Sequence, residues 1–370
     1  MKTVSIIDSC MVDYSGHHPD INLRLAREFK KRGCKVTVYA NKKFISKDPD
    51  LDIQPLFSYG AYEFISRLSE QAKSDSPMTM FQGLAAIFET EVAKIKRSDL
   101  SIIPTLFAHQ LYAISSPKIA LGKVFAGIHT HPTFKNPDGG VFWKMALIRA
   151  QARRAEISLG VFEPELILEY ESLMPHGGPE IEEFPIPHDG SDLGSLRKKL
   201  LTVGLLGHQR ETKGLPALSR TIEACAALGL KVTLQDSAGN MDKIVKGNPA
   251  VKLMGHVENM GALIRQCDVT LLDYSPDFYR FSGSGIAWES LASGVPVLAP
   301  KGTATSRTLR AFDAGATFSA TDQRAKFRVL EEMKRNYEQH LQRALVAQGK
   351  FRAKHGTSQF VDLMLGKPKL

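Results

Sequence analysis

Hydrophobic and polar positions in the first half of the chain alternate between two patterns. Val4–Ile7 is a short, mostly apolar run of the kind that forms a buried strand. Ile21, Leu25 and Phe29 then recur at the spacing of one helix face, and Lys35–Ala40 is a second strand-like run. A strand, a helix and another strand in this order predict a βαβ unit, in which the two strands are parallel.

The same alternation continues along the rest of the chain. In the first half, further strands are expected at Leu100–Leu106, Val124–Ile128 and Ile157–Phe162, and helices at about 81–97 and 141–155. In the second half, helical patterns separate the strand-like runs Leu200–Gly207, Lys231–Asp236, Val251–Gly255, Asp268–Tyr274 and Val295–Pro300. Between the halves, Pro175–Ser195 is rich in proline, glycine and acidic residues, which predicts a domain boundary with one short strand.

The length and composition favour a two-domain globular protein. At 370 residues the chain is longer than one hydrophobic core usually covers. No apolar run approaches the roughly 18–20 residues of a membrane span, and the start lacks the pattern of a signal peptide. The cysteines form no CxxC pair, which argues against a disulfide framework or a zinc site; they are Cys10, Cys34, Cys225 and Cys267. We therefore expect a cytoplasmic location.

The formal charge of +9 favours partners that carry phosphate, such as a nucleotide, a nucleic acid or an anionic lipid. Nucleic acid is the weaker candidate, because the sequence has neither zinc-finger spacing nor an RNP-type aromatic motif. The basic segment Phe142–Glu156 leaves two interpretations open. It could lie on an anionic membrane surface, or it is an ordinary amphipathic helix of its domain, which we favour.

The loop Gly207–Gly214, with the sequence GHQRETKG, joins an expected strand to an expected helix. Ligands bind at the carboxyl ends of parallel strands, and Arg210 and Lys213 are spaced so that both can reach one anion there. A guanidinium, an ammonium and the free N–H groups at a helix start would together neutralise a diphosphate. The alternative is a solvated basic turn.

A second glycine-rich turn, Gly283–Gly285, precedes a helix that carries Glu289 one turn from its start. The N-terminus of such a helix can cradle a phosphate, and the carboxylate of Glu289 can accept hydrogen bonds from both hydroxyls of a ribose. Alternatively, the glycines only turn the chain, and Glu289 interacts favourably with the helix dipole.

Together the two motifs resemble those of the retaining glycosyltransferases of the GT-B fold, family 4 type, also called glycosyl transferases group 1. The resemblance covers about residues 201–300 well and the first half in outline; it is carried by Gly207, Arg210, Lys213, Gly214, Ser284, Gly285, Glu289 and Gly294–Val297. It implies an α/β fold of two Rossmann-like, doubly wound domains that face each other across a cleft. Residues 1–185 would form the acceptor-side domain, joined by a C-terminal helix at about 350–370, and residues 186–349 the donor domain.

The resemblance also assigns roles in the donor domain. The diphosphate of the donor would be held by Gly207, Arg210, Lys213, Ser284, Gly285 and Ile286. Glu289 would bind the ribose, and the nucleobase would be cradled by Gly255, His256 and Val257. Many members of the family carry an acid eight residues before the helix glutamate, where this chain has Phe281 and matches a shorter SG-x-x-x-E pattern instead. This departure leaves open what grips the hydroxyls of the donor sugar, and Asp277 is one candidate.

In the first half, a glycine and several histidines stand at the ends of expected strands. Gly16 permits a close backbone approach, and by the resemblance its loop faces the donor phosphates and the acceptor. His17 and His18 could each touch substrate, or instead cap and pack beside the helix start. His129 stands where the family has a strand-end histidine that contacts the donor sugar. We therefore expect Gly16, His17 and His129 at the catalytic centre and His18, His109 and His131 on the acceptor side. No metal is expected at the His129–His131 pair, because no third ligand with zinc-like spacing is near.

These features predict a glycosyltransferase that moves a sugar from a nucleoside-diphosphate donor to a glycan, lipid-linked or protein-linked acceptor in the synthesis of a surface polysaccharide or glycoconjugate. By the resemblance, the reaction proceeds with retention and without a metal or other cofactor, in the cytoplasm or at the inner face of the membrane. Two alternatives stay open. One is a nucleotide-sugar epimerase of the same fold, and the other is a non-catalytic partner subunit that binds nucleotide or glycan, which Phe281 favours.

Overall fold

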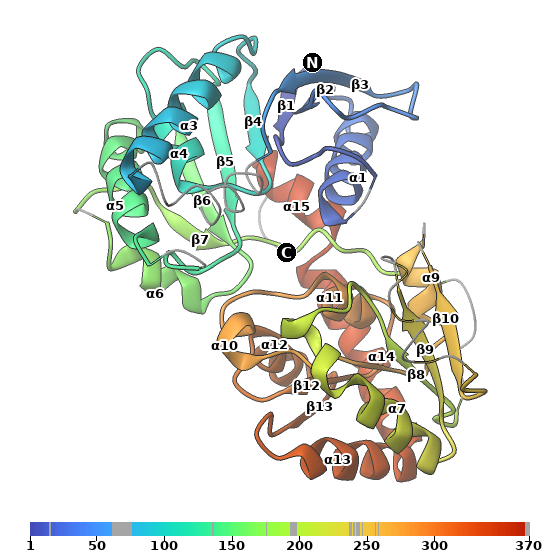
Figure 1. Cartoon of the computed structure of the whole chain (residues 1–370). Helices are drawn as coiled ribbons and strands as arrows, with labels where there is room; N and C mark the ends of the chain where they lie inside the picture. Colours follow the sequence, from blue (N-terminus) through green and yellow to red (C-terminus); the bar gives the residue numbers. More distant parts are fainter. Residues whose placement is uncertain are drawn as a thin grey trace. The chain divides into compact units, whose positions relative to one another are not determined.

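The computed structural model describes residues 1–14, 16–60, 76–134, 137–174, 176–192, 198–236, 239, 241, 245, 247–255, 257 and 259–366. The chain divides into two compact units (Figure 1). The first contains Met1–Pro187 and the segment that begins at Phe360, and the second contains His188–Gln359. The chain thus passes from the second unit back to the first within its last helix, α15 (Thr357–Met364).

The first unit is built on a seven-stranded parallel sheet with the order β3-β2-β1-β4-β5-β6-β7. Its strands are β1 (Thr3–Ile7), β2 (Lys35–Asn41), β3 (Asp52–Phe57), β4 (Leu100–Ile103), β5 (Lys123–Ile128), β6 (Ile157–Val161) and β7 (Ile181–Glu183). Its helices are α1 (His17–Lys31), α3 (Pro77–Val92), α4 (Ala108–Ile114), α5 (Gly139–Ala150) and α6 (Glu165–Glu171).

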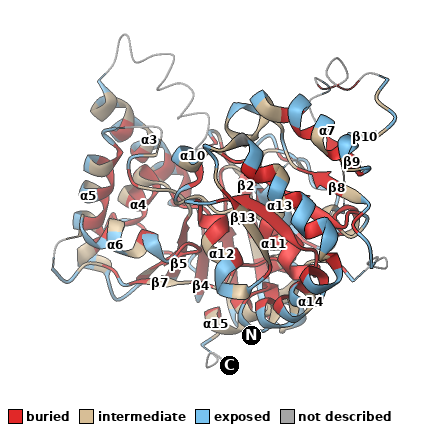
Figure 2. Ribbon diagram, turned by 90° about the horizontal axis from the view of Figure 1, so that it is seen from below, coloured by how far each residue is buried: buried red, intermediate tan, exposed pale blue. Residues whose placement is uncertain are grey.

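The core of this unit lies between the sheet and one face of each helix. The helix α1 buries Ile21, Leu25 and Phe29, the three residues whose spacing predicted it, because they share one side of the helix. The strand β5 is buried along almost its whole length, as expected where helices cover both faces of a parallel sheet. Figure 2 shows the same pattern, with buried strands and with helices that are exposed on their outer side.

The second unit repeats this architecture on a six-stranded parallel sheet with the order β10-β9-β8-β11-β12-β13. Its strands are β8 (Thr202–Leu205), β9 (Lys231–Gln235), β10 (Val251–Met254), β11 (Val269–Leu271), β12 (Val297–Pro300) and β13 (Gly315–Phe318). Its helices before α15 are α7 (Leu218–Ala227), α9 (Met260–Ile264), α10 (Pro276–Tyr279), α11 (Gly285–Ala292), α12 (Ala304–Phe312), α13 (Gln323–Arg335) and α14 (Tyr337–Lys354).

Each sheet has one point where the strand order reverses. In the first unit β1 lies between β2 and β4, and in the second β8 lies between β9 and β11. In open α/β sheets, ligands bind beyond the carboxyl ends of the strands at such a switch point. The loops that follow β1 and β8 are therefore where a site is expected in each unit.

The pattern of apolar runs missed two edge strands. The strand β3 is mostly exposed and contains Pro55, and β13 is only partly buried over Gly315–Thr317, so neither shows a continuous apolar run. The short strand expected between the two halves is β7. The helix predicted at 81–97 begins earlier, at Pro77, where the Ser76 side chain accepts a hydrogen bond from the Thr79 N–H.

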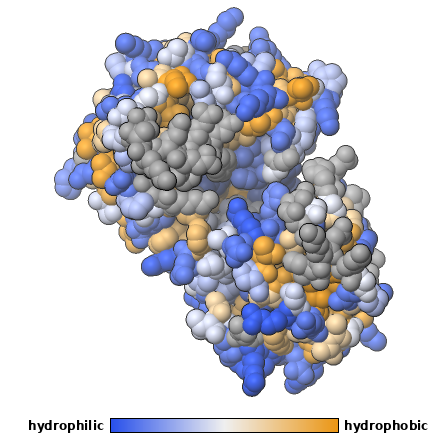
Figure 3. Space-filling view, in the orientation of Figure 1, coloured by the Kyte–Doolittle hydropathy of each residue, from blue (hydrophilic) through white to orange (hydrophobic). Residues whose placement is uncertain are grey.

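On the face drawn in Figure 3, hydrophobic residues are interspersed with hydrophilic ones on both units. The basic helix α5 buries Phe142 and Ala146 and leaves Val141 and Ile148 about half exposed, so one of its sides packs on its own domain. Among the described residues, no helix combines the length and the apolar character needed to cross a bilayer.

Candidate functional site

The loop after β8 folds as a tight turn that depends on two glycines. Gly207 and Gly214 have φ angles of 87° and 86°, a region that residues with a side chain rarely adopt. Gly214 also packs against Asp273, since a Cβ at Gly214 would lie 2.6 Å from the Asp273 Cβ. The segment between them forms the 3-10 helix Glu211–Lys213, which places Arg210 and Lys213 at its two ends.

Arg210 and Lys213 are two cations that converge without a carboxylate partner among the described residues. The Nζ of Lys213 lies 5.1 Å from the ring centroid of Tyr274 and 5.9 Å from that of Tyr279, so the ammonium faces two aromatic rings. Burial and, second, the charge of Arg210 lower the pKa of Lys213 to about 8. Neither residue forms an ion pair within the described part of the chain. The site therefore carries positive charge that an anion could neutralise.

The two tyrosines connect this loop to the next one. The Arg210 Nη2 donates a hydrogen bond to the Tyr279 hydroxyl at 2.9 Å, and the two tyrosine rings lie 4.3 Å apart. The Tyr274 hydroxyl is 3.1 Å from the Oγ of Ser284. Burial raises the pKa of Tyr274 above its usual range, so this hydroxyl stays neutral. No sequence motif marks either tyrosine, because the helix α10 has only four residues and is too short to show a periodic pattern.

Ser284 begins the helix α11. Its side chain accepts a hydrogen bond from the Ala287 N–H at 3.2 Å, which makes it the N-cap residue. Gly283 has no room for a side chain, because a Cβ there would lie 2.1 Å from the Trp288 ring. The segment that contains Tyr274 and Tyr279 therefore leads to the N-terminus of α11, which is the positive end of the helix dipole.

The loops after β8 and before α11 are in contact. A Cβ at Gly207 would lie 3.3 Å from Ile286, the second residue of α11. Ile286 packs against a small hydrophobic cluster, and so does Val257, which follows β10. The structure therefore places Gly207 next to Ile286, and it places Ile286 and Val257 around the same cluster. Gly255 is exposed directly after β10, and His256 lies outside the described residues.

Glu289 has a partner that the sequence analysis missed. The Nδ1 of His188 lies 3.0 Å from the Glu289 Oε2, and both side chains are largely buried. On the other side, Gly261 in α9 lets the backbone approach, since a Cβ there would lie 3.0 Å from the Glu289 Oε1. His188 is the first residue of the second unit and stands in the proline- and glycine-rich stretch, where no pattern marked it.

Phe281 stands at the position where the glycosyltransferases that this chain resembles commonly carry an acid. Phe281 is half-buried, and the guanidinium of Arg280 lies 4.9 Å from its ring centroid. Asp277, the candidate substitute, is exposed in the first turn of α10.

In the first unit, the loop after β1 contains a buried pair. The Nδ1 of His18 lies 2.8 Å from the Asp8 Oδ2, which also accepts a hydrogen bond from the Asn22 side chain. Burial alone would raise the pKa of Asp8, but the Coulomb interaction with His18 and the hydrogen bonds from His18, Asn22 and the Cys10 N–H outweigh it, so the pKa lies below its usual range. His18 therefore packs inside the unit.

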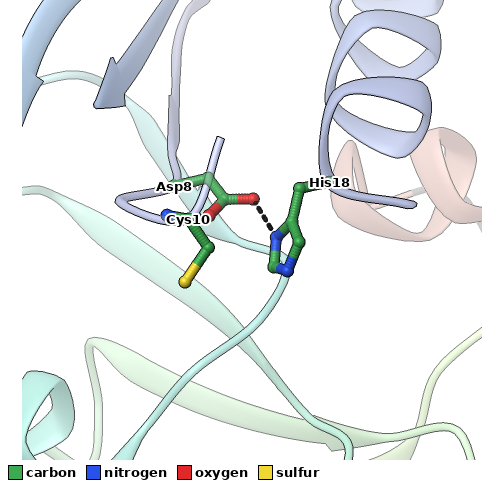
Figure 4. A group of neighbouring side chains, drawn as sticks. All are labelled: Asp8, Cys10 and His18. Carbon is green, nitrogen blue, oxygen red and sulfur yellow. Dashed lines mark hydrogen bonds and ion pairs between the residues drawn. The ribbon is translucent and has the colours of Figure 1, made fainter. Parts of the chain in front are cut away.

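Asp8, Cys10 and His18 are also a group of side chains of the kinds that bind metals, with one ligand atom from each within 4.8 Å of the others (Figure 4). The Asp8 Oδ1 accepts the Cys10 N–H at 2.8 Å, while its Oδ2 accepts from His18 and Asn22. Both carboxylate oxygens are thus already engaged. We interpret the group as a hydrogen-bonded network that fixes the loop between β1 and α1.

His17 and His129 lie at the carboxyl edge of the first sheet. His17 is exposed at the start of α1, directly after Gly16, which has a φ of 79°. Its ring centroid is 6.4 Å from that of His129, which follows β5. The Nε2–H of His129 donates to the Pro104 carbonyl at 2.7 Å, so this ring is held in place. The structure therefore brings Gly16, His17 and His129 together, because they follow β1 and β5, which only β4 separates in the sheet.

The other two histidines have different surroundings. The Nε2 of His131 lies 3.1 Å from the Glu169 Oε2 at a half-buried position. His109 is buried near the rings of Phe88 and Phe107, and burial lowers its pKa to about 3. Neither His18 nor His109 presents its side chain to solvent. Their assignment to the acceptor side stays a prediction.

We compared the chain with families of known proteins, with curated sequences and with solved structures. No family model matches the chain, and no curated protein matches it in sequence. Solved structures do match. Sucrose-phosphate synthase from Thermosynechococcus elongatus aligns over 98% of this chain and 97% of its own, with a TM-score of 0.71 and 12% identity. HepE from Anabaena, in complex with UDP and glucose, aligns over 99% of both chains, with a TM-score of 0.64 and 12% identity.

A third match is WaaG, a glycosyltransferase involved in lipopolysaccharide biosynthesis, which aligns over 98% of this chain and all of its own length, with a TM-score of 0.63 and 13% identity. This chain has the GT-B fold. The expected fold class, α/β with two Rossmann-like units, is thereby confirmed. At this level of identity the likeness shows the fold alone.

Proposed function

We propose that this protein is a glycosyltransferase that takes a sugar from a nucleoside-diphosphate donor. The observation that carries the proposal is the pair Arg210 and Lys213, which converge after β8 without an acidic partner in the described part of the chain. Partly buried cations of like charge destabilise each other, so the site is complementary to a strongly charged anion. A diphosphate supplies two or more negative charges over the short span that these residues cover.

The surroundings of the cations favour a nucleotide over a simple phosphate. The N-terminus of α11 offers backbone N–H groups to the same anion, and Glu289 lies one turn further on, where it could accept hydrogen bonds from a ribose. Gly255 and Val257, after β10, form the edge to which we assign the nucleobase together with His256. The structures of HepE with UDP and with UDP-glucose are consistent with such a donor in a protein of this fold.

In this role Arg210, Lys213 and the α11 N-terminus stabilise the diphosphate leaving group as its negative charge develops. Fixed cations and dipoles do this without reorganising during the step, and no metal ion is needed for it. Following the resemblance, we assign retention of configuration to the transfer. Gly16, His17 and His129 would then contact the donor sugar and the acceptor, and His18, His109 and His131 would shape the acceptor side.

We assign the acceptor to glycans, lipid-linked sugars or protein-linked sugars, in the cytoplasm or at the inner face of the membrane. The exposed Val141 and Ile148 on the basic helix α5 agree with a peripheral contact to anionic lipid. Synthesis of a surface polysaccharide or glycoconjugate is the pathway class that fits such an acceptor.

A second candidate function is a non-catalytic subunit that binds a nucleotide. Phe281 favours it, because the family's usual acid is missing there. A thermal-shift screen with UDP, GDP, ADP and dTDP tests the shared part of both candidates, since a ligand that binds the native state raises the unfolding midpoint. Slow hydrolysis of the matching nucleotide sugar without acceptor then supports the transferase. Binding without any hydrolysis supports the subunit, and no shift with any of the four contradicts both.

A further inference from the structure

Two aromatic side chains lie directly beneath the cations of the proposed donor site. Tyr274 follows β11, and Tyr279 is the last residue of α10, so both come from the segment that leads to the α11 turn. Their rings are tilted by 32° with centroids 4.3 Å apart, and both residues are buried. This contact holds the four-residue helix α10 against the end of the sheet.

Tyr279 orients the guanidinium of Arg210 through a hydrogen bond. A guanidinium has five N–H donors and a long, flexible side chain, so in an open loop it would sample many orientations. Here its Nη2 donates to the Tyr279 hydroxyl at 2.9 Å, a hydrogen bond from a charged donor. The bond uses one of the five donors and orients the group, while it adds no negative charge that would compete with a phosphate.

The rings of Tyr274 and Tyr279 hold the ammonium of Lys213 by cation–π interactions. The ammonium faces both rings at 5.1 and 5.9 Å, where the negative faces of the aromatic systems attract a cation. A carboxylate in this place would form an ion pair that a donor must first break. An aromatic face is a weaker partner, so it keeps the partly buried ammonium in place and leaves its charge to the ligand.

Tyr274 also reaches the second half of the site. Its hydroxyl lies 3.1 Å from the Oγ of Ser284, the residue that caps α11. The same ring that faces Lys213 thus fixes the turn whose backbone N–H groups would bind phosphate. One pair of tyrosines therefore connects every charged or dipolar part of the proposed diphosphate site.

We propose that Tyr274 and Tyr279 are positioning residues that hold Arg210, Lys213 and the first turn of α11 in one arrangement, ready for the donor diphosphate. The inference rests on the proposed function. It assigns a role to an aromatic pair that contacts Arg210, Lys213 and Ser284. Because the pair is neutral, the site stays cationic before the donor arrives.

The experiment uses the full chain and the tightest binder among UDP, GDP, ADP and dTDP. Tyr279→Phe keeps the ring beneath Lys213 and removes only the oxygen that orients Arg210. Since a hydrogen bond from a charged group is stronger than one between neutral groups, the Kd should rise about tenfold in calorimetric titration. For transfer, the KM for the donor should rise similarly with little change in kcat. Tyr274→Leu, which removes both the ring face and the bond to Ser284, should weaken binding further, and Tyr274→Phe should recover part of that loss.

A double-mutant cycle separates positioning from a general structural role. If Tyr279 acts through Arg210, then Tyr279→Phe has little further effect on the Kd in an Arg210→Ala background. The matched control is Tyr337→Phe, which removes a buried tyrosine hydrogen bond of 2.8 Å to the Asp268 carbonyl in the same unit and should leave the Kd unchanged.

The outcomes are distinct. An unchanged Kd in Tyr279→Phe, or fully additive effects of Tyr279→Phe and Arg210→Ala, overturns the inference while nucleotide binding by the wild type still supports the proposed function. A wild type that binds none of the four nucleotides overturns the proposed function and the inference with it. Weaker binding with an unchanged unfolding midpoint and strong coupling to Arg210 supports the positioning role.

Discussion

The imidazole of His188 lies 3.0 Å from the carboxylate of Glu289, with Nδ1 next to Oε2. The two residues are 101 positions apart in the chain, and both side chains are largely buried, at 6% and 13% exposure. Such a contact limits the rotamers of the glutamate, because a buried carboxylate keeps the orientation in which its hydrogen bond is made. The position from which Glu289 would bind a ribose is therefore set partly by His188.

We predict that His188→Phe weakens binding of the nucleotide several-fold, because it removes the hydrogen bond and leaves Glu289 free to turn. His188→Asn should retain most of the affinity, since the amide nitrogen of asparagine can take the place of Nδ1. Titration of the nucleotide against the wild type and both variants measures this. Equal affinities for His188→Phe and the wild type would show that Glu289 does not need its partner.

Removing the side chain of Lys213 or of Glu289 should impair use of the donor more than replacing His188 does. We expect Lys213→Ala and Glu289→Ala each to lower kcat/KM for the donor by about a hundredfold, the scale on which loss of one charged or preorganised group acts. Lys252→Ala is the control, because Lys252 is an exposed lysine on β10 of the same unit and should be neutral. Full transferase activity in both site variants would refute the assignment of the site.

The state of Lys213 also predicts how donor affinity depends on pH. Its pKa of about 8 lies below the usual 10.5, so the ammonium of the free protein loses its proton as the pH rises through 8. The neutral amine does not attract the diphosphate, which in a nucleotide sugar has no titrating proton in this pH range, so affinity should fall by up to about tenfold per unit above pH 8. Lys213→Arg stays charged and should remove this decline. A wild-type affinity that is constant between about pH 7 and 9.5 would contradict the prediction.

Much of the fold could be predicted because its signals are local. The face formed by Ile21, Leu25 and Phe29 defines α1, and the buried strands β1, β5 and β12 are short, mostly apolar runs. The edge strand β3 could not be predicted in the same way. An edge strand has one exposed side and only one neighbour, so polar residues and a proline are tolerated there and no periodic pattern remains.

The site was predictable only where its residues follow one another in the chain. Arg210 and Lys213 share a short loop, and Ser284, Gly285 and Glu289 share a turn and a helix, so each set is visible as a motif. The residues that connect these motifs are not. Tyr279 meets Arg210 across 69 positions, and His188 meets Glu289 across 101, through folding that no local spacing encodes.

The buried histidines predict loss of stability in mild acid. Burial lowers the pKa of His109 in the first unit to about 3, and burial with the charge of Lys354 does the same for His355 in the second. In the unfolded chain these groups bind protons near pH 6.5, so stability is full above 6.5 and is lost progressively as the pH falls from 6.5 toward 3.

The contribution of His109 can be measured by following the unfolding of the first unit alone. Trp143 lies in the first unit and Trp288 in the second, and the chain has no other tryptophan. In a Trp288→Phe background, the fluorescence of Trp143 reports unfolding of the first unit by urea. Adding His109→Gln should reduce the fall in the urea midpoint between about pH 7 and pH 4. An unchanged fall would mean that other groups cause the acid sensitivity.

The last prediction concerns the glycine that closes the Arg210–Lys213 loop. Gly214 and Gly229 have φ angles of 86° and 68°, so alanine at either position should cost about 1 kcal/mol of backbone strain. Only Gly214 also faces another residue closely, because its Cβ would lie 2.6 Å from the Asp273 Cβ, whereas nothing lies within 4 Å at Gly229. Gly214→Ala should therefore lower the unfolding midpoint more than Gly229→Ala does. It should also weaken nucleotide binding, since the loop must shift to relieve the clash and Lys213 is the adjacent residue. Equal midpoints and equal affinities in the two variants would mean that the contact with Asp273 does not hold the loop in place.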